Sequence, residues 1–82
     1  MIIIDARRWF DRIYGNTYHS VSVNVDGKHI GRVPFAYGYG EQYLQTAADI
    51  LKVDYNTLRA DMMEHRDKYH VTCSDVSRKR DL

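Results

Sequence analysis

The chain has few of the residues that cross-link small proteins, break strands or attract polyanions. Among its 82 residues are one cysteine, one proline and five glycines, and the formal net charge is +1. The single cysteine, Cys73, excludes an internal disulfide, and the small net charge gives no overall attraction to nucleic acid or membranes. No apolar run approaches the roughly 20 residues that span a bilayer. The apolar run at 1–4 is also too short for a signal peptide, so we expect a cytoplasmic protein.

The length and composition predict one folded domain over residues 1–82. The hydrophobic share of 44% and the charged share of 28% are ordinary for a globular domain rather than a disordered chain. We expect the segment 77–82, which contains Arg78, Lys79 and Arg80, to be a short, solvated basic tail.

A β-hairpin is predicted over about 17–36. Residues alternate in the first half, where one face is formed by His19, Val21, Val23 and Val25. Asp26-Gly27 is a strong signal for the tight turn of a hairpin. A bulge at Gly31 is needed to bring Val33 and Phe35 onto the valine face. Pro34 cannot donate a backbone hydrogen bond, which favours an edge position for the return strand.

Helical spacing follows a glycine-containing bend at residues 37–40. Over 41–52 the apolar stripe is formed by Tyr43, Leu44, Ala47, Ala48 and Leu51. Asp54 is a suitable N-cap for a second helix over 55–69. The spacing of Ala6, Trp9 and Phe10 also predicts a short helix over about 5–14, with an extended segment as the competing interpretation.

A third strand is predicted over about 70–76, where Val71 and Cys73 alternate with polar residues. We expect it to pair with the hairpin and cover its open edge. The predicted fold class is therefore α+β, with a small antiparallel sheet packed against two or three helices.

No pattern in the sequence points to catalysis, a metal or a cofactor. His65 and His70 are five residues apart, which is not the spacing that puts two ligands on one helix face. Gly38 and Gly40 lack the lysine and the following Ser or Thr of a phosphate loop. We therefore expect a non-enzymatic binding protein without cofactors or metals.

Tyrosines and arginines indicate where such a protein would bind. Both residue types are enriched at the energetic centres of protein interfaces. The predicted partner is a host or phage protein, and the predicted partner-binding residues are Tyr37, Tyr39, Tyr43 and Arg32. The oligomeric state is left open, and the sequence is compatible with a dimer.

Nucleic-acid binding is the alternative function. The run 19–51 resembles the hairpin-and-helix half of double-stranded-RNA-binding domains in its alternating valines, Asp-Gly-Lys turn and Ala-Ala helix. Where that family has a lysine cluster, however, this chain has Gly38 to Gln42. Residues 48–59 resemble a helix-turn-helix, in which Arg59 would begin the reading helix. The candidate phosphate contacts are Arg7, Arg8, Arg12, Arg59, Arg78, Lys79 and Arg80.

Three sequence blocks resemble small uncharacterised proteins encoded by bacteriophages and prophages. They are YGNTYHS at 14–20, FAYGYG at 35–40 and DVSRKRDL at 75–82. The resemblance implies a viral accessory protein in the cytoplasm of an infected bacterium. Proteins of this size and origin often bind a host machine stoichiometrically, for example as inhibitors of a defence system.

Overall fold

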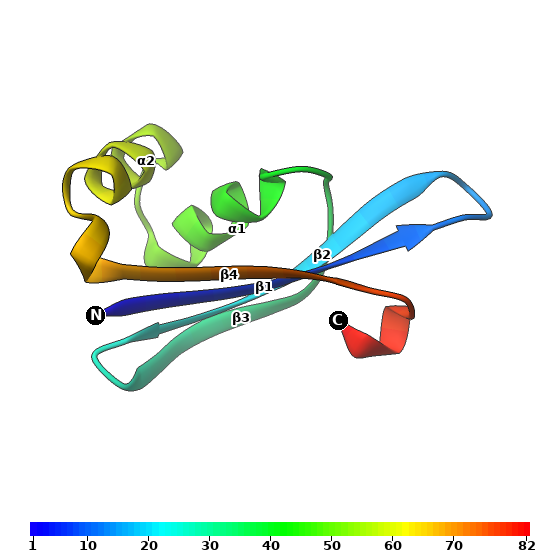
Figure 1. The fold of residues 1–82 in the computed structure, drawn as a ribbon, viewed down its shortest axis with the longest axis horizontal. Helices are drawn as coiled ribbons and strands as arrows, with labels where there is room; N and C mark the ends of the chain where they lie inside the picture. The colour runs from blue at the N-terminus through cyan, green and yellow to red at the C-terminus, as the bar shows by residue number, and fades with distance from the viewer.

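A four-stranded mixed sheet carries two helices on one face in the computed structural model, which describes residues 1–82 (Figure 1). The strand order is β3-β2-β1-β4. The strands are β1 (Ile2–Asp11), β2 (Asn16–Val25), β3 (Lys28–Tyr37) and β4 (Tyr69–Val76). The helices are α1 (Gln42–Leu51) and α2 (Tyr55–Glu64), with short 3-10 turns η1 (Arg66–Lys68) and η2 (Lys79–Asp81). The predicted α+β class is confirmed.

The N-terminal segment is a central strand, and the helix predicted over 5–14 is wrong. β1 pairs antiparallel with β2 and parallel with β4. Ile4 and Ala6 are fully buried on the face under the helices. Pairing along both sides of the strand satisfies its backbone groups, and this outweighs a weak local preference for helix. Ile13 and Tyr14 instead lie exposed around the β1–β2 turn.

The predicted hairpin is confirmed, and β3 contains two irregularities rather than one. The extra residue near the turn is Ile30, beside the predicted bulge at Gly31, and Val33 pairs with Val21 as expected. Gly31 allows close packing, because a Cβ atom there would lie 3.0 Å from Cγ2 of Ile50. The second irregularity adds a β3 residue opposite Ser20.

This second irregularity corrects the position predicted for Phe35. His19 pairs with Ala36 and Val21 pairs with Val33, so three steps along β3 match two steps along β2. Phe35 therefore lies on the face away from the helices, where its ring stacks on Tyr18 with centroids 4.6 Å apart. Tyr18 and Phe35 therefore lie on the opposite side of the sheet from the valine face.

β4 exists where the third strand was predicted, but its pairing differs from the prediction. It runs parallel to β1, beyond the hairpin, and leaves β3 as the opposite edge of the sheet. The α1–α2 connection between β3 and β4 carries the chain across the sheet. α2 also ends at Glu64 rather than 69, since the chain passes through η1 and enters β4 at Tyr69.

The predicted helix over 41–52 is confirmed as α1, and Asp54 caps α2 as predicted. The Asp54 carboxylate accepts hydrogen bonds from the backbone N–H groups of Asn56 at 3.0 Å and Thr57 at 3.3 Å. α1 ends at Leu51, and the following residue, Lys52, caps it in the left-handed conformation with a φ of +59°. Neither helix is long and apolar enough to cross a bilayer.

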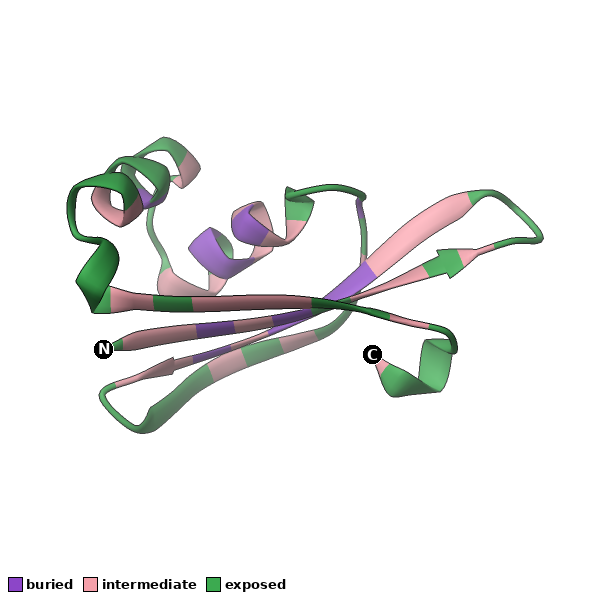
Figure 2. Cartoon of the chain, viewed as in Figure 1, coloured by how far each residue is buried: buried purple, intermediate pink, exposed green.

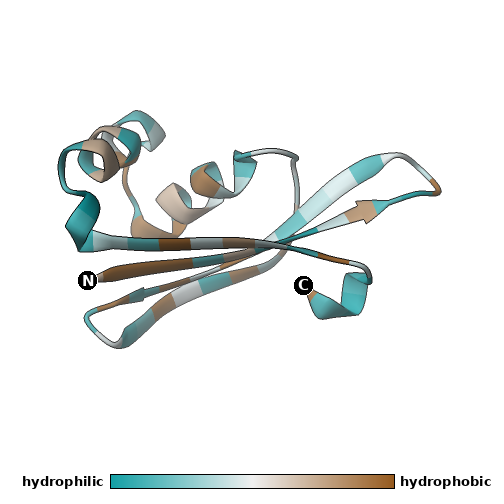
Figure 3. Cartoon of the chain, in the orientation of Figure 1, coloured by the Kyte–Doolittle hydropathy of each residue, from teal (hydrophilic) through white to brown (hydrophobic).

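The core lies between the helices and the middle of the sheet, where buried segments of α1 face buried segments of the central strands (Figure 2). The most hydrophobic strand segments are the start of β1 and the centre of β4 (Figure 3). The fully packed residues are Ile4, Ala6, Val21, Val23, Ala47, Ala48 and Leu58. The alanines let α1 approach the sheet closely, so a thin core suffices.

The segment 77–82 lies against the sheet face opposite the helices (Figure 1). Arg7 donates a hydrogen bond to the main-chain oxygen of Asp81, and Arg32 donates one to that of Leu82, each at 3.0 Å. The Lys79 ammonium lies 4.8 Å from the centre of the Phe35 ring. The segment therefore contacts the sheet through these groups, while residues 77–81 remain exposed to solvent.

Candidate functional site

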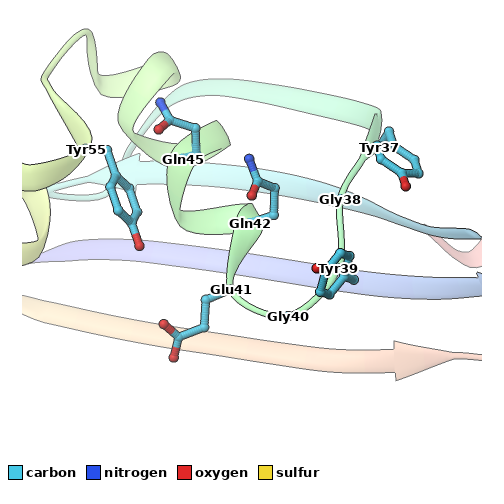
Figure 4. Close-up of a pocket in the computed structure, with 8 residues that line it drawn as sticks. All are labelled: Tyr37, Gly38, Tyr39, Gly40, Glu41, Gln42, Gln45 and Tyr55. Atoms are coloured by element: carbon cyan, nitrogen blue, oxygen red, sulfur yellow. The ribbon is translucent and has the colours of Figure 1, made fainter.

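A groove opens between the end of β3, the first turn of α1 and the start of α2 (Figure 4). We call it the tyrosine groove; its volume is about 530 Å³. Three aromatic side chains border it, and two glutamine amides project from α1 between them. The lining residues are Tyr37, Gly38, Tyr39, Gly40, Glu41, Gln42, Gln45 and Tyr55.

Three hydrogen bonds fix the backbone of residues 37–40. The Gly38 N–H donates to the carbonyl oxygen of Thr17 at 3.0 Å. The Gly38 carbonyl lies 3.2 Å from Nδ1 of buried His19. The Arg8 guanidinium donates to the Gly40 carbonyl at 3.0 Å. The tyrosines on this segment are therefore held on a defined backbone.

Glycine is required at position 38 for two reasons. Its φ is +149°, which side-chain-bearing residues rarely adopt. A Cβ atom there would lie 2.3 Å from Cγ and 2.7 Å from Cβ of Gln42. The chain thus reverses from β3 into α1 within van der Waals distance of the first turn of the helix.

Tyr37 and Tyr39 are the exposed aromatic residues of the groove. Their exposed fractions are 64% and 74%. Tyr37 has an edge-to-face contact with Tyr18, with ring centroids 5.8 Å apart. Tyr39 also borders a second hollow of about 350 Å³, which Arg8 and Asp75 help to line. The Tyr39 ring is therefore shared by two adjacent depressions.

The α2 side of the groove is charged but internally paired. The Arg59 guanidinium lies 3.5 Å from the Glu41 carboxylate and donates a hydrogen bond to the Tyr55 hydroxyl at 3.0 Å. These contacts raise the pKa of Arg59, first through the Tyr55 hydrogen bond, so the guanidinium stays charged. This wall offers both a cation and an anion.

The structure brings only two of the four predicted partner-binding residues together. Tyr43 is half-buried against the core, and burial, followed by the nearby Cys73, raises the pKa of its hydroxyl. Arg32 lies on the other face of the sheet, where it contacts Leu82. The arginine that supports this site is Arg8, which forms a 3.0 Å ion pair with Asp75 of β4.

Sequence reasoning missed the contributions of Glu41, Gln42, Gln45 and Tyr55. The glutamines are not part of the predicted apolar stripe over 41–52, and the structure leaves Gln42 exposed and Gln45 half-buried. Tyr55 is the first residue of the predicted second helix, and no binding role is predicted for it. Only the fold reveals that the first turn of α2 faces the first turn of α1.

The seven candidate phosphate contacts do not form one face. Arg8 and Arg59 lie on the helix side of the sheet. Arg12 is in the exposed β1–β2 turn, and Arg7 and Lys79 contact the opposite face. The helix that precedes the hairpin in double-stranded-RNA-binding domains is replaced here by β1.

No three His, Cys, Asp or Glu side chains gather closely enough to hold a metal ion. His19 is buried on the face of β2 that α1 covers, and both of its ring nitrogens form hydrogen-bonding contacts. No family model, curated protein or solved structure matches the chain.

Proposed function

We propose that this is a non-enzymatic accessory protein of bacteriophage or prophage origin that binds a host protein through the tyrosine groove. The observation that carries the proposal is the combination of exposed Tyr37 and Tyr39 side chains with a backbone fixed by three hydrogen bonds. Aromatic groups held in advance lose little conformational entropy on binding. Such groups supply much of the energy at protein interfaces.

The polar groups of the groove favour a protein as the bound macromolecule. Gln42 and Gln45 offer amide donors and acceptors, while Glu41 and Arg59 offer charges of both signs. This mixture suits peptide groups and mixed side chains better than the uniform negative charge of a nucleic-acid backbone. The groove therefore has aromatic borders with polar groups between them, a mixture that suits a protein surface.

Binding rather than catalysis also fits the chemistry of the lining. The only carboxylate, Glu41, faces Arg59, and no histidine, serine or cysteine lines the groove. Activated nucleophiles require a base within hydrogen-bonding distance. The viral origin and the role as an inhibitor of a host defence system follow from the resemblance of the three sequence blocks, together with the small size of the protein.

The test is capture of host proteins by the immobilised protein from bacterial lysate treated with nuclease. Wild type is compared with Tyr37→Ala/Tyr39→Ala and with Tyr14→Ala, whose ring is 78% exposed far from the groove. We expect one host protein to be retained stoichiometrically by wild type and Tyr14→Ala and lost with the double variant. Thermal unfolding of all three establishes that they are folded.

Two results would contradict the proposal. One is equal retention of the same host protein by wild type and the Tyr37→Ala/Tyr39→Ala variant, which would locate binding elsewhere. The other is the absence of any stoichiometric host protein once nuclease is added. In that case the captured material would have been held by nucleic acid.

A further inference from the structure

The outer edge of β4 has main-chain groups without a partner. β4 follows β1 residue for residue from Tyr69 to Val76, with no bulge. No hydrogen bond joins the main chain of residues 70–76 to any segment other than β1. An edge strand presents a row of unpaired N–H and C=O groups to solvent. In Figure 1, β4 runs in front of the other strands and no helix crosses it.

The opposite edge of the sheet, β3, is protected against further pairing. β3 contains Lys28 and Pro34, and its pairing with β2 is interrupted by two irregularities. Lysine, proline and bulges are the means by which natural proteins prevent edge strands from adding another strand. β4 contains none of the three. The two edges therefore differ, and β4 is the one that can accept a further strand.

The hydrophobic core extends to the β4 edge without being closed there. Tyr69, Val71 and Cys73 pack against the core but are only half-buried. The centre of β4 is also among the most hydrophobic strand segments of the chain (Figure 3). A strand placed beyond β4 would cover the outer side of Val71 and Cys73 and remove more apolar surface from water.

We propose that β4 pairs antiparallel with β4 of a second copy of this chain, around a two-fold axis at Thr72. This pairing joins two four-stranded sheets into one of eight strands. Val71 of each copy then lies opposite Cys73 of the other, the two Thr72 residues face each other, and no like charges are opposed. An axis at Cys73 would instead set Val71 opposite the Asp75 carboxylate. The strand is thus complementary to itself in one register.

This edge is separate from the tyrosine groove, so the dimer adds to the proposed function. A two-fold axis perpendicular to the sheet keeps the helices of both copies on the same face. Both tyrosine grooves therefore open on one side of the dimer. A target with two matching sites would bind such a dimer more tightly than a monomer.

Sedimentation velocity of the full chain under reducing conditions tests the dimer, and we expect wild type to shift from monomer to dimer as its concentration rises. His70 and Ser74 are exposed, and in the proposed register each lies opposite the other in the second copy. His70→Glu/Ser74→Glu sets like charges opposite each other twice, whereas His70→Lys/Ser74→Glu sets opposite charges there. We expect the first variant to dimerise at least about tenfold more weakly than the second. Arg7, which pairs with Ser74 on β1, is next to the same new glutamate in both variants.

Cross-linking tests the register. In Thr72→Cys/Cys73→Ser the new thiols face each other across the axis, where Cα atoms lie about 4.5–5.5 Å apart, and a disulfide can form at this distance. Lys28→Cys/Cys73→Ser places the thiol on the protected β3 edge and is the control. On mild oxidation we expect a covalent dimer to form rapidly with the first variant and slowly with the control.

Three results would overturn the proposal. The first is a monomer at every concentration of wild type. The second is equal dimerisation of the two charge variants, both folded by circular dichroism. The third is equal cross-linking through residues 72 and 28.

Discussion

His19 of β2 and Thr46 of α1 lie 2.7 Å apart, from the imidazole Nε2 to the hydroxyl oxygen, and they join the sheet to the helix that borders the tyrosine groove. On the other side of the ring, Nδ1 lies 3.2 Å from the Gly38 carbonyl. A carbonyl oxygen only accepts, so Nδ1–H donates to it. In the neutral ring, Nε2 then accepts the Thr46 hydroxyl proton. One buried imidazole thus contacts both α1 and residues 37–40, which we call the Tyr-Gly segment.

Thr46→Val tests this junction, because valine keeps the shape of threonine but leaves the buried Nε2 without its donor. An unsatisfied buried polar atom costs about 1–3 kcal/mol, so we expect a loss of that size in the free energy of unfolding measured with urea. Thr46→Ser keeps the hydroxyl and is the matched control, with a smaller expected loss. Equal losses in the two variants would show that the hydrogen bond contributes nothing beyond packing.

Gly38→Ala and Gly40→Ala form a second matched pair on the Tyr-Gly segment. At Gly40 the φ is +62° but nothing lies within 4 Å of a new Cβ, so we expect a loss of about 1 kcal/mol from backbone strain alone. At Gly38 the new Cβ would also overlap Gln42, so the expected loss is about 2–4 kcal/mol. Urea unfolding measures both. A smaller loss for Gly38→Ala than for Gly40→Ala would contradict the tight approach of residue 38 to α1.

Tyr69 of β4 donates a hydrogen bond to the Asp61 carboxylate of α2, and this pair predicts how stability depends on alkaline pH. Burial, followed by the bond to Asp61, raises the pKa of Tyr69 to about 12, whereas the ordinary value is 10.0. The folded state therefore holds the phenolic proton more tightly than the unfolded state. The resulting stabilisation is present below pH 10 and is lost as pH rises through about 12.

Tyr69→Phe should remove this dependence. We expect the difference in unfolding free energy between wild type and Tyr69→Phe to shrink between pH 10 and 12. Tyr14→Phe, at an exposed turn, is the control and should follow wild type throughout. Absorbance titration of the phenols gives an independent measurement, in which Tyr69→Phe loses a component with a midpoint near 12. A constant difference across this range would mean that folding does not raise the pKa of Tyr69.

The parts of the fold that sequence reasoning predicted correctly are those with strong local signals. The period of two in β2, the Asp26-Gly27 turn and the stripe of α1 depend on nearby residues, and all three are present. A helix was predicted where β1 lies because Ala6, Trp9 and Phe10 have helical spacing, and an extended segment was the competing interpretation. What decides between the two is the strand pairing on both sides of β1, which is non-local and is not encoded in a local pattern.

The same limit applies to the candidate site. Tyr37 and Tyr39 could be predicted as exposed aromatics, since they flank glycines at a bend. Arg32 was predicted in the same site because arginine is enriched at interface hot spots, but its guanidinium contacts Leu82 rather than the groove. Tyr55 lines the groove because α2 packs against α1, a relationship that depends on the whole connection between β3 and β4.

Arg8 of β1 contacts both the segment 37–40 and β4. Its replacement tests whether Tyr37 and Tyr39 depend on it for their position. Its guanidinium donates to the Gly40 carbonyl at 3.0 Å and pairs with Asp75 at 3.0 Å. We expect Arg8→Gln to lower the free energy of unfolding by about 1–2 kcal/mol, mainly because the charged hydrogen bond to the Gly40 carbonyl is lost. Asp75→Asn leaves that bond in place and removes only a solvent-exposed ion pair, so its expected cost is below about 1 kcal/mol.

Amide hydrogen exchange distinguishes a local effect of Arg8 from a global one. The N–H of Gly38 donates to Thr17 and that of Gln42 donates to Tyr39, so these two amides report on the Tyr-Gly segment. We expect Arg8→Gln to speed exchange at both while the amides of β1 and β2 keep their relative protection, and Asp75→Asn to leave both close to wild type. Uniform acceleration across the sheet would mean that Arg8 stabilises the whole fold rather than positioning the tyrosines. Unchanged exchange at Gly38 and Gln42 would mean that His19 and the Thr17 carbonyl hold the segment without it.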